Sequence, residues 1–257
     1  MQNRVKEKLL NDEVVLGTFF HMGSTVAIES LGIAGLDYII IDTEHAPFHE
    51  ESALEYIRAA ELKGITPFVR IKDISRSSIL RMLDIGAKGL IIPCVETVEE
   101  VHKIVEYGKY APVGNRGFIF SRVAEYGYSK DASSIESYMN LCNENTMLIP
   151  QCETVGCLNN IEEIVSIDGI DGIFVGPYDL SIGLKIPGQF DNPIFKEALT
   201  RILNACNKVN KPAFIFTASI DACKSYIKAG YKGIAYNVDV AVYIDVFRKI
   251  SKEILDR

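Results

Sequence analysis

Residues 38–93, YIIIDTEHAPFHEESALEYIRAAELKGITPFVRIKDISRSSILRMLDIGAKGLIIP, alternate three short apolar runs with two longer amphipathic segments. The apolar runs have the Ile-rich and Val-rich composition of strands buried on both faces of a parallel sheet, and they are Tyr38–Ile41, Thr66–Ile71 and Gly89–Pro93. The segments between them carry apolar residues at steps of three and four, which predicts the helices Glu50–Lys63 and Arg76–Ile85. The stretch therefore predicts consecutive β-then-α units.

The same alternation extends along the whole chain. Further apolar runs predict strands at Val14–Phe20, Met147–Cys152, Gly172–Val175, Ala213–Phe216 and Lys232–Tyr236. Helical spacing recurs at Ser24–Ala34, Val98–Tyr107, Cys157–Ser166, Pro193–Val209, Ile220–Ala229 and Val238–Ile254. Eight such units in a chain of 257 residues favour an α/β fold of the (β/α)8 TIM barrel type. An open doubly wound sheet is the alternative, but no glycine-rich nucleotide-binding motif follows any of these strands.

Composition restricts the expected partners and location. The net charge is −7 without a basic stripe, so neither nucleic acid nor an anionic membrane is an expected partner. The charged start lacks the apolar core of a signal peptide, and six cysteines without a C-x-x-C motif indicate reduced packing thiols in a cytoplasmic protein. No composition break divides residues 1–257, so we expect one domain. Its irregular stretch Lys109–Ser134 is an insertion of the kind that is usually functional or an interface.

Polar residues follow several predicted strands at the point where each strand ends. In a barrel, the C-terminal ends of the strands meet at one rim, where catalytic side chains lie. The residues concerned are Asp42 and His45 after the second strand, Arg70 in the third, Gln151 and Glu153 in and after the fifth, and Gly176–Asp179 after the sixth. The sequence therefore predicts an active site at this rim.

Two carboxylates in this set, Glu153 and Asp179, follow neighbouring strands. Adjacent strands lie about 4.8 Å apart, so both side chains could reach one ion. Carboxylates without a Cys or His ligand beside them suit a hard divalent cation, and two protein ligands would leave positions for water or a chelating substrate. The alternative is that Glu153 caps the following helix and Asp179 holds a turn.

Two cationic side chains lie near the end of the third strand. Arg70 stands in the buried run PFVRI, where its charge is costly unless it meets an anion. It therefore predicts either a structural ion pair or a clamp for a substrate carboxylate or oxyanion. An imine-forming aldolase would need a lysine that points inward from a strand, whereas Lys72 lies past the apolar run and is expected to reach solvent. These positions favour a metal over an imine.

One histidine lies close to an aspartate at the rim. His45 follows Asp42 by three residues, and an aspartate bonded to one ring nitrogen would orient the histidine as a general base. The alternative is that His45 is a surface residue. His21, His49 and His102 are assigned to the surface, although His21 also ends the first strand.

Four stretches of the chain resemble the motifs of the HpcH/HpaI aldolases, whose prototype activity is that of 4-hydroxy-2-oxoheptanedioate aldolase. They are IIIDTEHAP, PFVRI, LIPQCET and GIFVGPYDLS, in family order, and the likeness runs from about Gly17 to Phe247. The resemblance implies a class II pyruvate aldolase on a (β/α)8 barrel, dependent on Mg²⁺, Mn²⁺ or Co²⁺. Its substrates would be small molecules, namely a 4-hydroxy-2-oxo acid that is cleaved to pyruvate and an aldehyde.

The resemblance also implies roles for individual residues. By position, Glu153 and Asp179 match the metal ligands of the family. His45 matches the catalytic base, with Asp42 as its partner. Arg70 matches the arginine beside the pyruvate carbonyl and enolate.

Three further positions match the substrate site of the family. Gln151 matches a glutamine of the rim, and the backbone around Gly176 and Tyr178 matches the segment that holds the pyruvate carboxylate. The chain departs from the prototype in two places, because Tyr178 replaces an alanine and His21 replaces a smaller, less basic residue. Both departures lie where the acceptor aldehyde would be selected.

Assembly and alternative functions complete the expectations. Members of the family form homohexamers, often by exchanging their last helix, and the amphipathic helix Val238–Ile254 is compatible with this. An acyl-CoA lyase of the citrate lyase β-subunit group is the nearest alternative enzyme. A barrel that binds a 2-oxo acid without turnover is the non-enzymatic alternative.

Overall fold

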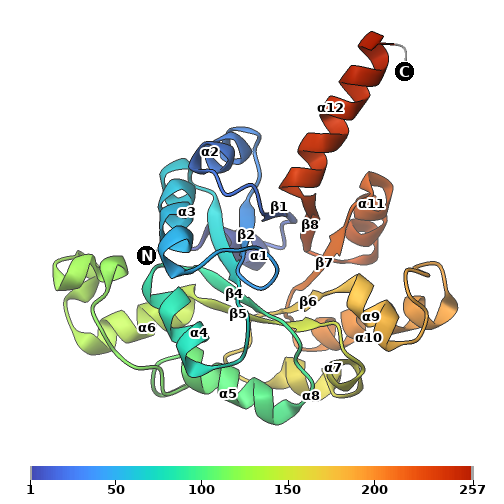
Figure 1. The fold of residues 1–257 in the computed structure, drawn as a ribbon. Coiled ribbons are helices and arrows are strands. Elements are labelled where there is room, and N and C mark those ends of the chain that lie inside the picture. The colour runs from blue at the N-terminus through green and yellow to red at the C-terminus, as the bar shows by residue number, and fades with distance from the viewer. Residues whose placement is uncertain (1, 256–257) are drawn as a thin grey trace.

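Parallel strands form a closed barrel in the computed structural model of the protein, which describes residues 2–255 (Figure 1). The strand order follows the chain, and β1 pairs with both β2 and β8. The strands are β1 (Val15–Phe20), β2 (Tyr38–Asp42), β3 (Thr66–Arg70), β4 (Gly89–Ile92), β5 (Met147–Cys152), β6 (Ile173–Val175), β7 (Ala213–Thr217) and β8 (Gly233–Val238). This confirms the predicted TIM barrel and excludes the open doubly wound sheet.

Helices surround the barrel, and most of them were predicted from apolar spacing. Those predicted are α2 (Thr25–Ile33), α3 (Glu50–Lys63), α4 (Arg76–Asp84), α5 (Val98–Gly108), α10 (Pro193–Lys208), α11 (Ile220–Ala229) and α12 (Asp239–Leu255). The predicted helix Cys157–Ser166 is two helices, α7 (Val155–Asn159) and α8 (Ile161–Ser166). Three helices were not predicted: α1 (Arg4–Leu10), α6 (Ile135–Asn145) and α9 (Pro177–Gly183).

Residues alternate along each strand between two apolar cores. In β2, Tyr38 and Ile40 belong to the core inside the barrel, whereas Ile39 and Ile41 belong to the core between the strands and the helices. This two-residue step is the strand period, and it explains why the strand sequences are apolar without a break. Asp42 lies two residues after Ile40, so the same alternation turns its side chain toward the inside of the barrel, at the end where the strands finish.

Glycines allow aromatic rings to fill the narrow interior. A Cβ atom added at Gly17 would lie 2.4 Å from the Tyr38 ring, and one added at Gly233 would lie 1.8 Å from the Phe214 ring. Both distances are below any real contact, so these glycines leave the space that the rings occupy. The interior is thus packed solid below the rim, which keeps the polar residues at the mouth.

The irregular stretch Lys109–Ser134 lies at the opposite end of the barrel from the mouth. It contains the short 3-10 helices η1 (Arg122–Gly127) and η2 (Lys130–Ala132). Arg116 pairs with Asp84 at 2.7 Å, and Arg122 pairs with Glu61 at 2.9 Å, so the stretch packs near the C-terminal ends of α4 and α3. These helix ends lead into the starts of strands, and the stretch therefore does not line the mouth of its own chain.

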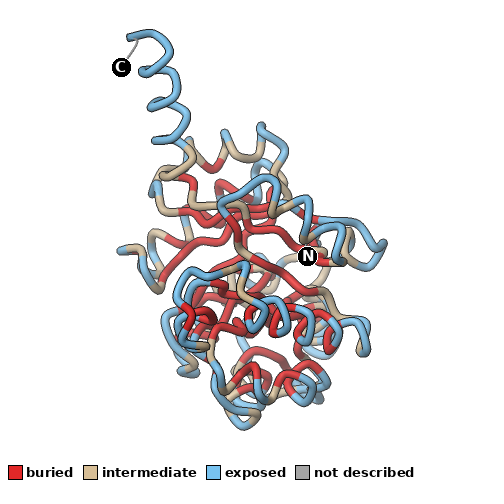
Figure 2. Tube along the Cα trace, turned by 90° about the vertical axis from the view of Figure 1, so that its right-hand side faces the viewer, coloured by how far each residue is buried: buried red, intermediate tan, exposed pale blue. Residues whose placement is uncertain are grey.

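The last helix, α12, projects away from the barrel (Figures 1 and 2). Within it, only Asp239 at its start is buried among the residues that the structure describes. No helix within residues 2–255 has both the length and the apolar composition that crossing a membrane requires. Cys142, Cys152, Cys157 and Cys206 are buried, as predicted for packing residues, whereas Cys223 is half-buried and Cys94 is exposed, so the prediction is wrong for Cys94.

Candidate active site

A cavity of about 170 Å³ opens at the C-terminal ends of the strands. It is lined by Phe19, His21, His45, Arg70, Gln151, Phe174, Gly176, Pro177, Tyr178, Asp179, Phe216 and Val238. Most residues predicted for the site are among them. The other two, Asp42 and Glu153, are buried directly behind this lining, where they contact Arg70 and Gln151.

Asp42 and Arg70 form a buried ion pair at the ends of β2 and β3. The strand register places them side by side, as it does every pair from Tyr38 and Thr66 onward. Arg70 Nε donates to Asp42 Oδ1 at 2.9 Å, and Arg70 Nη2 donates to Asp42 Oδ2 at 2.6 Å. Such a two-point contact fixes the guanidinium plane.

The charges of this pair are kept by its hydrogen bonds. Burial alone would raise the pKa of Asp42, but bonds from His21 and Arg70 and the positive charge of Arg70 outweigh it and lower the pKa well below its usual range. Burial likewise would lower the pKa of Arg70, and the bonds to Asp42 raise it instead. Arg70 is therefore a fixed cation at the bottom of the mouth.

The imidazole bonded to Asp42 is that of His21, and the predicted Asp42–His45 ring contact is wrong. His21 Nε2 lies 2.7 Å from Asp42 Oδ2. Asp42 reaches His45 only at its backbone N–H, 3.3 Å from Oδ1, and the His45 ring lies 3.8 Å from Glu44 Oε2. Closure of β1 beside β2 brings His21 to Asp42, a contact between residues far apart in the sequence. The signal that could have found it was the position of His21 at the end of a strand.

Glu153 is buried directly after β5, and both oxygens of its carboxylate accept hydrogen bonds. Its Oε1 accepts from the backbone N–H of Cys94 at 2.7 Å, and its Oε2 accepts from the Gln151 side-chain amide. A Cβ atom added at Gly176 would lie 2.8 Å from Glu153 Oε2 and 2.8 Å from Gln151 Nε2. The close approach of β6 to this pair therefore requires glycine at position 176.

Asp179 lies in the first turn of α9 and is exposed toward the mouth. The sequence predicted only a segment after β6, yet Pro177 at the first helical position is a known signal of a helix start. Burial is the largest cause that raises the pKa of Glu153 and of Glu44. The negative charge of Asp179 raises both pKa values further. Three carboxylates therefore place an excess of negative charge on this side of the mouth.

The donor set fits a hard divalent cation that takes only part of its coordination from the protein. Among the described residues, neither Glu153 nor Asp179 forms an ion pair, and Arg70 is bonded to Asp42 and lies 3.3 Å from Glu44. Gln151 Oε1 is buried and has no hydrogen-bond partner among the described residues. Within residues 2–255, no three His, Cys, Asp or Glu side chains are spaced to hold a metal by themselves. A cation here would complete its shell with water or substrate oxygens.

Aromatic rings form the other side of the mouth. Phe19 contacts Phe174 and Phe216 edge to face, with ring centroids 5.9 and 5.7 Å apart. Tyr178 extends this wall, 6.0 Å from Phe216 and 5.1 Å from Phe190, and half of its surface is exposed. The mouth thus has a charged side, formed at the ends of β2, β3 and β5 with Asp179 of α9, and an apolar side formed by these aromatic rings.

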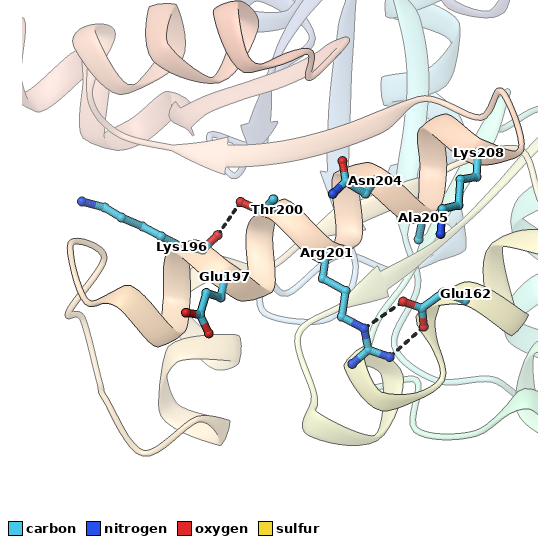
Figure 3. A pocket seen from close by; sticks show the side chains of 8 residues that line it. All are labelled: Glu162, Lys196, Glu197, Thr200, Arg201, Asn204, Ala205 and Lys208. Carbon is cyan, nitrogen blue, oxygen red and sulfur yellow. Dashed lines mark hydrogen bonds and ion pairs between the residues drawn. The ribbon is translucent and has the colours of Figure 1, made fainter.

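A wider hollow of about 450 Å³ lies on the outside of the barrel along α10 (Figure 3). Its one arginine, Arg201, is bound to Glu162 of α8 by two hydrogen bonds of 2.8 and 2.7 Å. Its other charged side chains, those of Lys196, Glu197 and Lys208, are spread along α10, and Lys196 pairs with Asp191 outside the hollow at 2.9 Å. The hollow therefore lacks the converging unpaired groups that the barrel mouth has.

Comparison with known proteins assigns the chain to a class of enzyme. The chain belongs to the HpcH/HpaI aldolase/citrate lyase family, whose sequence model matches residues 16–246. The fold and the family together define an aldolase, an enzyme of the lyase class.

Individual relatives agree with this assignment. The 2-keto-3-deoxy-L-rhamnonate aldolase of Escherichia coli strain K12 is 31% identical over 247 residues, which cover 95% of this chain and 90% of that enzyme. The crystal structure of an HpcH/HpaI aldolase/citrate lyase family protein from Burkholderia cenocepacia J2315 is 30% identical, with a TM-score of 0.91 over 98% of this chain and 99% of that one. An HpcH/HpaI aldolase from Desulfitobacterium hafniense DCB-2 is 29% identical, with a TM-score of 0.90 over 97% and 95% of the two chains.

Proposed function

We propose that this enzyme is a divalent-metal-dependent aldolase that cleaves a 4-hydroxy-2-oxo acid to pyruvate and an aldehyde, and that it catalyses the reverse addition. The observation that carries the proposal is the convergence of Glu153, Asp179 and Arg70 at one mouth. A 2-oxo acid has adjacent carboxylate and keto oxygens. These oxygens could bind to a cation that is held by the two carboxylates, and the fixed Arg70 could donate hydrogen bonds to them.

The metal would be held by Glu153 and Asp179. Mg²⁺, Mn²⁺ or Co²⁺ at these two residues would act as a Lewis acid that polarises the keto group of the substrate. The Cys94 N–H and the Gln151 amide orient the Glu153 carboxylate. Such orienting contacts commonly decide metal affinity.

The chain's own groups would bind and activate the substrate. The Arg70 guanidinium donates to the keto oxygen and stabilises the negative charge that this oxygen gains when the C3–C4 bond breaks. The Gly176–Tyr178 backbone and Gln151 bind the carboxylate of the substrate. His45, which lines the cavity and is 65% exposed, accepts the 4-hydroxyl proton and passes it to solvent.

The aldehyde part of the substrate would lie against the aromatic wall. Apart from Arg70, no lysine or arginine among the described residues lines the cavity. An uncharged aldehyde therefore suits the wall better than one that ends in a carboxylate. The absence of a lysine from this lining, with Lys72 exposed, also leaves an imine mechanism without its nucleophile at the cavity.

Metal removal tests the proposed function. Protein treated with EDTA should lose cleavage of 4-hydroxy-2-oxo acids, because two carboxylates alone do not polarise a keto group. Adding Mg²⁺, Mn²⁺ or Co²⁺ back should restore it. The measurement is pyruvate release from a panel of aldol adducts made from uncharged and carboxylated aldehydes, with each ion in turn.

Other outcomes of this experiment would contradict the proposal. Cleavage that survives EDTA, together with a covalent adduct after borohydride and pyruvate, would establish an imine enzyme. Turnover only of CoA thioesters would establish the acyl-CoA lyase, and pyruvate binding without any turnover would establish a binding protein.

We also propose a homo-oligomer in which α12 of one copy covers another. A (β/α)8 barrel needs a helix over the outside of β8 and β1, but α12 leaves this face, and Leu16 of β1 is 42% exposed there. An apolar hollow of about 510 Å³ lies between α2 and α12 at this seam. The exposed apolar residues of α12, including Tyr243, Phe247 and Ile254, supply a matching face.

The assembly can be tested by disrupting the apolar face of α12. Phe247→Asp should shift the protein toward monomers and lower its melting temperature, because a charge cannot be buried in an apolar interface without a partner. Size-exclusion chromatography with light scattering would measure the mass. Lys252→Asp, on the opposite side of α12 from Tyr243 and Phe247, is the matched control and should leave the mass unchanged. A wild-type monomer at micromolar concentration would refute the proposal.

A further inference from the structure

Two histidines line the mouth, and they differ in how they are held. The His21 side chain is 28% exposed and bonded to a fully buried carboxylate, Asp42. The His45 side chain is 65% exposed, and its nearest acidic atom is 3.8 Å away. Only His21 therefore has a fixed ring orientation.

The backbone at His21 is anchored as well. Its N–H donates to Asp239 Oδ1 at 2.8 Å, and the next N–H, that of Met22, donates to Asp239 Oδ2 at 3.1 Å. Asp239 is buried at the start of α12. The loop after β1 is thus bound to β2 through the ring and to α12 through the backbone.

The shared carboxylate also decides which ring nitrogen of His21 can exchange a proton. Asp42 is ionised and can only accept hydrogen bonds, so Nε2 of His21 carries the hydrogen in their 2.7 Å contact. Nδ1 has no partner among the described residues and is the nitrogen that can gain and lose a proton. The same carboxylate binds Arg70, which places His21 beside the group proposed to hold the enolate oxygen.

We infer that His21, oriented by Asp42, is the acid–base residue that protonates carbon 3 of the pyruvate enolate. Cleavage needs two proton transfers, and the proposed role of His45 accounts only for the one at the 4-hydroxyl group. In the second, Nδ1–H of the His21 imidazolium gives its proton to carbon 3, the enolate electron pair forms the C–H bond, and the neutral ring takes a proton back from water. Asp42 stabilises the imidazolium. The inference rests on the aldolase function proposed above.

Other charged and titratable groups lie around the mouth that His21 lines, and their charges would affect proton transfer at its imidazole. They are Asp42 and Glu44 of the β2 end, Arg70 of β3, Asp179 of α9, Asp239 of α12, and His45 across the cavity. Within residues 2–255, Asp42 is the one side chain that forms a hydrogen bond or ion pair with the ring of His21. A substitution of His21 that keeps the contact with Asp42 therefore tests the ring itself.

Exchange of the pyruvate methyl protons isolates this step, because it needs no aldehyde. The rate of deuterium incorporation from D₂O, followed by NMR with the metal-loaded protein, should fall about 100-fold or more in His21→Gln, the range expected for loss of a general acid or base. The glutamine amide can still donate to Asp42, so the fold should be kept, as thermal unfolding would verify. Added imidazole should restore part of the exchange in His21→Ala.

Comparison with cleavage of a 4-hydroxy-2-oxo acid sharpens the test. The ratio of exchange rate to cleavage rate should fall in His21→Gln and rise in His45→Gln, whereas His102→Gln on the outside of α5 should change neither rate. Exchange in folded His21→Gln within tenfold of the wild type would overturn the inference. So would a wild-type protein that cleaves substrate without exchanging pyruvate protons. A wild-type protein that does neither would instead refute the proposed function.

Discussion

Glu153→Gln should reduce the kcat of aldol cleavage by about three orders of magnitude, equivalent to about 4 kcal/mol of transition-state stabilisation. Glutamine has nearly the same shape, and its carbonyl oxygen can still accept from the Cys94 N–H. What it lacks is the negative charge that would attract a divalent cation beside Asp179. The loss should therefore appear in metal affinity and turnover, and far less in the melting temperature.

Calorimetric titration with Mn²⁺ and steady-state kinetics would measure these two effects. Glu162→Gln is the matched control, because Glu162 lies outside the barrel in an exposed pair with Arg201. It should leave both metal affinity and turnover unchanged. Normal turnover and metal binding in folded Glu153→Gln would remove this residue from the proposed metal site.

Asp42→Asn should destabilise the folded protein by about 3 kcal/mol, the lower end of the range for breaking a buried ion pair from one side. The side chain of Asp42 is 0% exposed and contacts both Arg70 and His21. Without that charge, the buried Arg70 guanidinium keeps only its longer contact with Glu44, in which Nε lies 3.3 Å from Oε2. Urea unfolding of the metal-free proteins would measure the difference in free energy, and Asp191→Asn, at an exposed position, should have little effect.

The stability difference between wild type and Asp42→Asn should also depend on pH in one direction. Because the pKa of Asp42 is lowered in the folded state, the unfolded chain, with an ordinary carboxyl pKa of about 3.9, takes up the proton first as the pH falls. The contribution of Asp42 is therefore fully present at neutral pH. It decreases as the pH falls below about 4. A difference that widened on acidification would contradict this assignment.

The barrel could be predicted because its signals are local. The strands of the interior core are buried on both faces, so runs such as Tyr38–Ile41 are apolar without interruption and stand out from the helical spacing around them. Arg70 was conspicuous for the same reason, since a charge in such a run needs an anion. The structure supplies that anion as Asp42, its neighbour in the strand register. Of the two predicted alternatives for Arg70, the ion pair is present; Arg70 also lines the cavity, and its role as a clamp for the substrate stays a prediction.

The identity of the histidine at Asp42 could not be predicted in the same way. Proximity in sequence favoured His45, but that ring turns toward Glu44 and solvent. His21 reaches Asp42 only because β1 lies beside β2 and because Asp239, more than two hundred positions later, binds the loop that carries His21. α9 was missed for a different reason, because its seven residues are too few to show apolar spacing.

The division of the mouth into two halves has an evolutionary consequence. The groups that would hold the keto acid are locked by register and buried hydrogen bonds, as Asp42 and Arg70 are. Among the rings opposite, Tyr178 is half exposed, and its side chain contacts the rings of Phe190 and Phe216. Substitutions on that wall can therefore change which aldehyde is accepted, whereas the residues that would form the pyruvate enolate stay the same. Related enzymes with this barrel could therefore evolve different products while they keep the same aldol reaction.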